Sequence, residues 1–144
     1  MERIRELLNN VSTMTLATTD LDGNPHAAPV YFVHDENLKL FFFSDQKSQH
    51  CQNIAQNPRS AAAIYPECAG WQEIKGLQLR GQVHLVESPE VWDSAWELYQ
   101  RKFLFVRALK AVISQNDLYA LIPSWIRLVD NSQGFGFKRE WNLP

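Results

Sequence analysis

The chain has few of the features that mark specialised proteins. Its two cysteines, Cys51 and Cys68, follow no metal-ligand spacing, so we expect two free thiols in a reducing compartment. No apolar run approaches the roughly 20 residues that a membrane span needs. Basic and acidic residues nearly balance, with 14 Lys and Arg against 16 Asp and Glu. The charge therefore gives no reason to expect nucleic acid or an anionic membrane as a partner.

Several catalytic motifs are also absent. The sequence contains no G-x-S-x-G, and no G-x-G-x-x-G follows a strand, so hydrolase and dinucleotide-binding functions have no support. Its histidines form neither H-x-x-x-H nor H-E-x-x-H, so we expect no metal site. The first six residues lead into an amphipathic stretch, which is not the pattern of a signal peptide. We expect a cytoplasmic protein.

Aromatic residues are plentiful, with 5 Trp, 4 Tyr and 8 Phe in 144 residues. The length suits one domain with one core, and we expect residues 1–144 to form it. The aromatic residues have two interpretations. They pack a core and a dimer interface, or some of them line a site for a flat ligand.

The hydrophobic pattern predicts a mainly β protein of the α+β class. Ile4, Leu7 and Leu8 lie at helical spacing and predict a helix over 2–10. Ser88-Pro89-Glu90 is a strong helix start, and a second short helix is expected over 104–113. Strands are expected over residues 14–19, 26–34, 38–43, 60–65, 74–87, 118–129 and 135–143. Six or seven strands that begin with a hairpin predict an antiparallel barrel with peripheral helices.

The segment Ser44–His50 is the first candidate site, because it joins a strongly apolar strand to a helix that we expect to begin at Ser44 or Asp45. A helix N-terminus has unpaired N–H groups and favours an anion. Lys47 adds a charge, Ser48 a hydroxyl donor and His50 an imidazole. Two interpretations stay open: a phosphate site, or a capped helix with a solvated surface.

The second candidate is the strand segment Ala28, Pro29, Val30 and Tyr31, where small residues stand beside aromatic ones. Small side chains allow a planar ring to lie against the backbone, whose N–H and C=O groups would then contact the edge of the ring. The alternative is ordinary strand packing.

Several separated motifs occur in order and carry a resemblance. They are Thr15-Leu16-Ala17-Thr18, the hairpin 22–30, the polar segment Ser44–His50, Asn57-Pro58-Arg59 and the strand 77–83. Over residues 12–87 the chain resembles the pyridoxamine 5′-phosphate oxidase-like superfamily of FMN-binding split barrels. The segments 99–103 and 130–138 resemble a bacterial subgroup of small single-domain members that has no settled reaction.

The resemblance implies an antiparallel split β-barrel that forms a homodimer with two FMN sites at the subunit interface. Ser44, Lys47, Ser48 and His50 would meet the phosphate, and residues 28–31 would face the isoalloxazine. His50 stands where many relatives have Lys or Arg. Gln78 and Trp141 would reach the flavin from the partner subunit.

The resemblance therefore implies an FMN-dependent oxidoreductase that acts on a small substrate with an electron donor, neither of which the sequence names. No catalytic residue can be assigned. The alternative is a non-enzymatic dimeric split barrel that binds haem or another ligand, and a third interpretation is a structural dimer module without a ligand.

Overall fold

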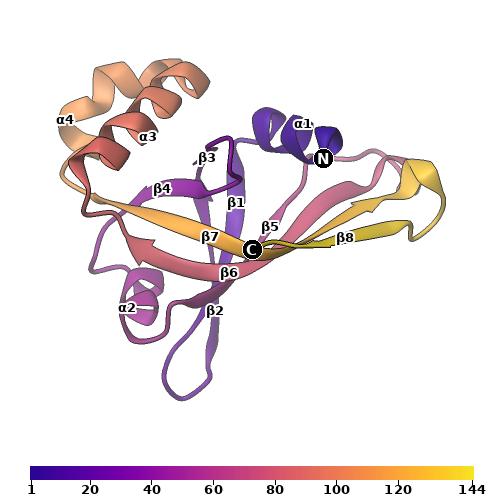
Figure 1. Cartoon of the computed structure of the whole chain (residues 1–144), viewed down its shortest axis with the longest axis horizontal. Helices are drawn as coiled ribbons and strands as arrows, with labels where there is room; N and C mark the ends of the chain where they lie inside the picture. The colour runs from indigo at the N-terminus through magenta and orange to yellow at the C-terminus, as the bar shows by residue number, and fades with distance from the viewer.

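An antiparallel sheet curled into half a barrel forms the body of the protein, in a computed structural model that describes residues 1–144 (Figure 1). The strands are β1 (Thr13–Thr19), β2 (Pro25–Tyr31), β3 (Val33–His34), β4 (Leu40–Ser44), β5 (Arg59–Ile64), β6 (Lys75–Leu85), β7 (Asp117–Asp130) and β8 (Lys138–Asn142). They run in the order β2-β1-β5-β6-β7-β4-β3, and β8 also pairs with β7. The predicted antiparallel barrel architecture with peripheral helices is confirmed.

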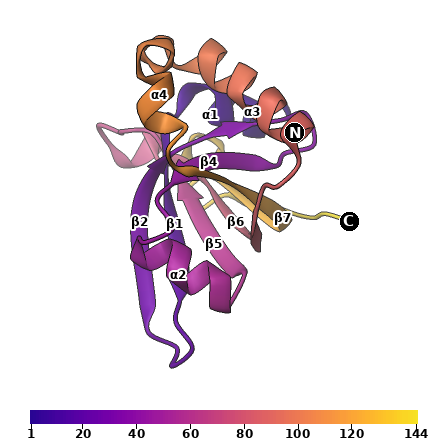
Figure 2. The same ribbon diagram turned by 90° about the vertical axis from the view of Figure 1, so that its left-hand side faces the viewer.

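Four α-helices and three short 3₁₀ helices surround this sheet. The α-helices are α1 (Glu2–Asn10), α2 (Gln49–Gln56), α3 (Pro89–Lys102) and α4 (Lys110–Ile113), and the 3₁₀ helices are η1 (Trp71–Glu73), η2 (Leu104–Leu109) and η3 (Asn131–Gln133). Figures 1 and 2 show α3 and α4 together at one end of the sheet. None of the helices combines the length and the apolar content that crossing a bilayer requires.

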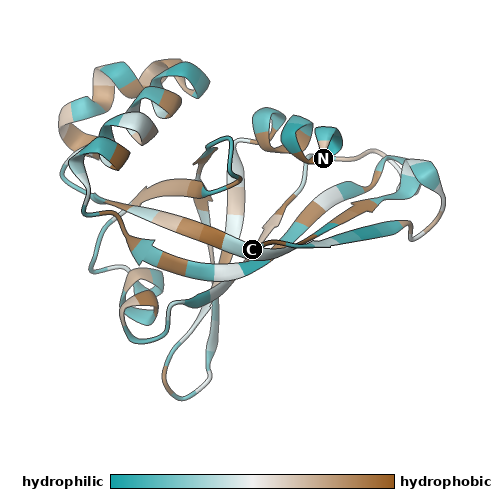
Figure 3. Cartoon of the chain, in the orientation of Figure 1, coloured by the Kyte–Doolittle hydropathy of each residue, from teal (hydrophilic) through white to brown (hydrophobic).

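The main core lies on the inner face of the curled sheet. Alternation along β1 and β6 turns Leu16, Leu77 and Leu79 inward, where they are at most 1% exposed. Helix α1 adds Ile4 and Leu8 to the same cluster, as its helical spacing predicts. Figure 3 shows these apolar stretches alternating with polar ones along the strands.

A second core lies between α3 and the other face of β4. Trp96 and Tyr99 pack there with Phe41 and Leu118. The hydroxyl of Tyr99 donates to the carbonyl oxygens of Tyr31 and Phe41, at 3.0 and 3.1 Å. Strand β4 is therefore buried on both faces, as its continuous apolar run predicts.

A β-bulge bends the sheet where β6 meets β7. Arg80 pairs with Trp125, but Gly81 pairs with Pro123, which leaves Ser124 as the extra residue. A Cβ atom on Gly81 would lie 2.1 Å from the carbonyl oxygen of Ile122, so only glycine fits there. The bulge accounts for a glycine and a proline inside two long paired strands.

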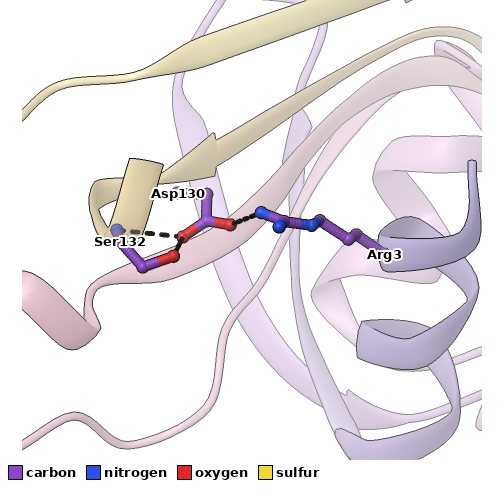
Figure 4. Close-up of polar contacts among 3 residues, drawn as sticks. All are labelled: Arg3, Asp130 and Ser132. Carbon is purple, nitrogen blue, oxygen red and sulfur yellow. Dashed lines mark hydrogen bonds and ion pairs between the residues drawn. The ribbon is translucent and has the colours of Figure 1, made fainter. Parts of the chain in front are cut away.

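The start of α1 is tied to the far end of β7. Arg3 forms an ion pair with the buried carboxylate of Asp130, which also accepts from the N–H and the hydroxyl of Ser132, at 3.1 and 2.6 Å (Figure 4). These contacts fix the N-terminal helix to the turn that leads into β8.

Several predicted boundaries are wrong. Helix α2 begins at Gln49, because the hydroxyl of Ser48 caps it while Ser44 stays in β4. The strand expected over 26–34 breaks at Phe32 into β2 and β3, and η2 replaces the first half of the expected helix 104–113. The last strand begins at Lys138, because the preceding turn holds Gly136 with a positive φ of 74°.

Candidate functional site

A tight turn connects β4 to α2 and shapes the Ser44–His50 segment. The N–H of Lys47 donates to the Asp45 carboxylate, and the N–H of Ser48 donates to the Asp45 carbonyl, both at 2.9 Å. The Ser48 hydroxyl donates to the same carbonyl at 2.7 Å and accepts from the N–H of Cys51 at 3.4 Å. Ser48 is therefore the N-cap, and the N–H groups of the first turn that follow it point out of the helix end.

Three of the four predicted phosphate residues converge at this helix start. The imidazole of His50 is buried, and its Nε2 lies 2.5 Å from the Oγ of Ser44 and 3.3 Å from the Oγ of Ser48. Its ring is stacked on that of His26 from β2, with 6.4 Å between centroids and 12° between planes. Lys47 does not join this cluster: its side chain is exposed and makes no ion pair or hydrogen bond.

The same hydroxyls and imidazole also surround the buried thiol of Cys51. Burial raises the pKa of this thiol, but hydrogen bonding to the polar groups around it, His50 first, outweighs burial and places the pKa below its ordinary value. The hydroxyl of Tyr119 is another of these polar groups, and burial raises the pKa of Tyr119. The start of α2 is therefore a dense polar cluster at the edge of an apolar core.

Strand β2 presents two different faces. The side chains of Ala28 and Val30 point into the core and are 9% exposed, whereas Pro29 and Tyr31 point outward. Tyr31 is 53% exposed and meets Phe105 edge to face. Because β2 is an edge strand of the sheet, one side of its backbone has no strand partner and can hydrogen-bond a ligand. A flat ligand could therefore contact Pro29, Tyr31 and this backbone edge, but not the side chains of Ala28 and Val30.

Figure 2 shows α2 beside the ends of β1 and β2. The side-chain amide of Asn53 donates to the hydroxyl of Thr18 at 3.1 Å, which holds the helix on β1. The two candidate segments, α2 start and β2, are thus neighbours in space although the sequence separates them.

Gln78 and Trp141 lie in another part of the sheet. Ser44 pairs with Asp117 at the start of β7, whereas Gln78 pairs with Arg127 and Trp141 with Ile126 near its end. Nine or ten residues of strand separate these pairs, which is roughly 30 Å. Within one chain, Gln78 and Trp141 cannot reach a ligand held by the Ser44–His50 cluster.

A groove on the exposed face of the sheet corresponds to none of the sequence motifs. A cavity of about 880 Å³ lies over β1, β5, β6 and β7, and its lining includes Arg59, Arg80 and Trp125. The alternation of β6 places Arg80 on this face, but only the pairing of β5 with β6 brings Arg59 beside it. The strand register, rather than any motif, creates this site.

Comparison with known proteins identifies the family. The family model for pyridoxamine 5′-phosphate oxidase matches residues 1–130. A UPF0306 protein of Yersinia pestis is 28% identical over 116 residues, which cover 80% of this chain and 75% of that protein.

Three solved structures share the fold. The haem storage protein HutZ of Vibrio cholerae has a TM-score of 0.73 at 21% identity, over 85% of this chain and 88% of HutZ. ChuZ of Campylobacter jejuni reaches 0.82 at 18% identity, over 98% of this chain and 58% of ChuZ. A haem-binding protein of Mycobacterium smegmatis reaches 0.74 at 22% identity, over 95% of this chain and 57% of that one. At these identities the likeness establishes the fold. Because the family model matches residues 1–130 of the 144, the chain belongs to the pyridoxamine 5′-phosphate oxidase family.

Proposed function

We propose that this protein binds FMN, with the phosphate at the start of α2 and the isoalloxazine against strand β2. One observation carries the proposal: Ser44, Ser48 and His50 converge at a helix N-terminus, and His26 stacks on His50. The stacking places the beginning of β2 next to the anion-binding end of α2, so one elongated ligand could contact both.

The chemistry of the cluster suits a phosphate. The first-turn N–H groups of α2 and the helix dipole favour an anion. Ser44 and His50 form a buried pair. When the Nε2–H of His50 donates to the Oγ of Ser44, the hydroxyl proton of Ser44 is free to donate to a phosphate that approaches the helix end. Lys47 is free to swing toward the anion, because nothing in the chain holds its ammonium.

We further propose that the protein is an oxidoreductase for a small organic substrate. The bound flavin would supply the electron-transfer chemistry. The protein would orient the ring along the β2 edge, exclude water with the exposed ring of Tyr31 and its neighbour Phe105, and leave one ring face open to substrate and electron donor.

A homodimer is part of this proposal. The residues of β7 that pair with Gln78 and Trp141 lie roughly 30 Å along that strand from the residue that pairs with Ser44. Gln78 and Trp141 therefore contact the flavin only if a second copy supplies them. The sheet face that carries no helix is the surface available for that copy. We also propose that residues 1–144 act as one domain, since the two apolar clusters share β4, and that the protein works in the cytoplasm.

Haem binding without catalysis is the second candidate. Two structures that share the fold are a haem storage protein and a haem-binding protein, and imidazole is a common haem ligand. This chain holds two nearly parallel imidazoles, His26 and His50. However, Nε2 of His50 is hydrogen-bonded to the hydroxyl of Ser44. This hydrogen bond would have to break before Nε2 could bind iron.

FMN and riboflavin titrations test the first proposal, because the two ligands differ only in the phosphate. We expect FMN to bind at least tenfold more tightly than riboflavin. A tenfold difference corresponds to about 1.4 kcal/mol of binding free energy contributed by the phosphate. Ser48→Asp keeps a capping side chain but places a carboxylate beside the phosphate, so it should remove this difference. FMN that binds no better than riboflavin would sink the proposal.

Haemin titration tests the alternative. A Soret shift that His26→Ala and His50→Ala both abolish, together with no uptake of FMN, would favour haem.

Light scattering on a sizing column tests the homodimer. We expect twice the mass of the chain, and a strict monomer would remove the role proposed for Gln78 and Trp141.

A further inference from the structure

Residues 104–116 connect α3 to β7, and we call them the strap. They contain the short helices η2 and α4, and Figure 1 shows α4 beside α3 at one end of the sheet. Every hydrogen bond of the strap, from its backbone and its side chains, stays within residues 103–116. No ion pair involves the strap either. Polar contacts therefore do not fasten the strap to the sheet or to α3.

A single fully buried side chain anchors the strap. Val106 is 2% exposed and belongs to the same apolar cluster as Trp96, and the half-buried Ile113 lies against that cluster. Leu104 and Val112, in contrast, are 83% and 62% exposed. A segment with local hydrogen bonds and little buried apolar surface opens at a much lower free energy than the whole domain unfolds.

Both ends of the strap are fixed. Before it, Phe103 is 6% exposed, and its N–H donates to the carbonyl oxygen of Tyr99 at 2.9 Å. After it, Leu118 is 1% exposed and pairs with Phe43 in β4. The strap can therefore lift as a loop between two fixed points, while α3 and β7 keep their places.

The strap covers a polar group that has no partner. The indole N–H of Trp96 is the one buried side-chain polar group of the chain without a hydrogen bond. Lys110 from α4 places its ammonium 5.7 Å from the centre of this ring. A buried donor without an acceptor disfavours the closed form, and water supplies an acceptor when the strap lifts. This gain offsets part of the cost of exposing Val106.

The strap also contacts the strand of the proposed flavin site. The ring of Phe105 meets that of Tyr31 edge to face, with 5.8 Å between centroids. Tyr31 is the last residue of β2. Phe103 also meets Tyr31, at 5.3 Å, but it lies outside the strap. Lifting the strap therefore removes Phe105 from Tyr31 and uncovers one side of the outward face of β2.

We propose that the strap opens and closes as one unit and is a gate beside strand β2. Opening is a property of the chain alone and requires no ligand. The role as a gate rests on the proposed function, because it assumes that the flavin ring lies against Tyr31 and Phe105. A flavin that contacts Phe105 binds the closed form, and a ligand that binds one form shifts the equilibrium toward it.

Amide hydrogen exchange followed by NMR tests the opening on the full chain without ligand. The reporters are the hydrogen-bonded amides of Val106, Ser114, Gln115 and Asn116. We expect their opening constants to agree within about threefold and to exceed those of amides in the middle of α3 at least about a hundredfold. Strap amides that exchange as slowly as those of α3, or that exchange independently of one another, overturn the proposal.

A replacement at Trp96 tests the unpaired donor. Benzothienylalanine, incorporated site-specifically, keeps the shape of the indole but has sulfur in place of the N–H. Trp96→benzothienylalanine should lower the opening constant about tenfold, because the closed form no longer contains an unpaired donor. The same replacement at Trp92, which is only half-buried on the same helix, should leave the constant unchanged. An equal effect at both positions contradicts the role of the Trp96 N–H.

A replacement at Val106 tests the anchor. Val106→Ala removes buried apolar surface from the strap alone, so it should raise the opening constants of all four reporters together, by about tenfold. Arg107→Ala changes an exposed neighbour and should have no effect. An increase confined to the amide of residue 106, or one that extends equally to α3, means that the strap does not open as a unit.

FMN separates the gate from the opening. At about 100 times its Kd, FMN should lower the opening constant of the strap about 100-fold. Ser48→Asp should remove this effect at the same FMN concentration, because it weakens FMN binding. Bound FMN that leaves strap exchange unchanged overturns the gate. A chain that binds no FMN contradicts the proposed function instead, and the ligand-free exchange still decides whether the strap opens.

Discussion

The Nε2 atom of His50 lies 2.5 Å from the Oγ of Ser44 inside the protein. This contact joins the end of β4 to the first turn of α2 across six residues. It also means that the imidazole of His50 is hydrogen-bonded to a neighbouring hydroxyl. A phosphate that accepts from Nε2 would have to replace this hydrogen bond.

A permanent charge at this position should strengthen phosphate binding. His50→Lys replaces the imidazole by an ammonium on a flexible chain, which can extend from the partly apolar site toward the helix end. We expect FMN to bind about tenfold more tightly, because a hydrogen bond to a charged group contributes about 1.5–3 kcal/mol. Quenching of flavin fluorescence measures the affinity.

Gln49→Lys is the matched control, since Gln49 is exposed on the same helical turn. If the added positive charge acted only through long-range electrostatic attraction, His50→Lys and Gln49→Lys would increase the affinity for FMN equally. Weaker FMN binding by His50→Lys, with an unchanged melting temperature, would contradict the assignment of His50 to the phosphate site.

Ser48 has a structural role that can be separated from ligand binding. Its hydroxyl caps α2 through the N–H of Cys51. Ser48→Ala should lower the free energy of unfolding by about 1 kcal/mol, whereas Ser48→Asp should retain most of it, because Asp also caps helices well. Urea unfolding followed by circular dichroism compares the two. Equal loss in both variants would mean that the cap is not the source of the stability.

Lys102 joins the end of α3 to the end of α1 and to the residue between β2 and β3. Its ammonium donates to the carbonyl oxygens of Leu8, Val11 and Phe32, at 2.8, 2.8 and 3.1 Å. Lys102→Met leaves these partly buried carbonyls without a donor, so we expect a loss of about 1–3 kcal/mol in unfolding free energy. Arg101→Met is the control. Arg101 pairs with Glu97 on the exposed surface, and its loss should stay within about 0.5 kcal/mol.

Asp130 should make the stability of the protein depend on pH in the acid range. Burial raises the pKa of Asp130, but hydrogen bonds from Ser132 and the charge of Arg3 outweigh burial and hold the pKa below its ordinary value (Figure 4). Because the folded state favours the ionised carboxylate, its contribution is complete above the unfolded pKa of about 3.9 and is lost as pH falls through the lower folded pKa.

Asp130→Asn should therefore destabilise the protein at neutral pH and flatten the acid limb of the stability curve. Thermal melts between neutral and strongly acid pH measure this. Asp22→Asn, in an exposed turn, should leave the curve unchanged. An acid limb of Asp130→Asn that is as steep as that of the natural chain would assign the pH dependence to other carboxylates.

Local patterns predicted those parts of the fold whose stabilisation is local. The spacing of Ile4, Leu7 and Leu8 predicts α1 with its observed bounds, and Ser88-Pro89 predicts the start of α3. The predicted start of α2 is wrong because Ser44, Asp45 and Ser48 are all residue types that cap helices. Ser44 stays in β4 because it pairs with Asp117, a contact 73 positions along the chain that no local pattern contains.

The candidate site shows the same division. Local patterns predict the polar segment before α2 and the apolar strand β4, because propensity, capping and alternation act over a few residues, and the order of the motifs along the chain indicates the family. Three relationships follow from the folded chain alone: His50 faces Ser44 and not solvent, Gln78 and Trp141 lie far from that pair, and Arg59 lies beside Arg80. These relationships depend on strand register and helix packing, which long-range burial of apolar side chains sets for the chain as a whole.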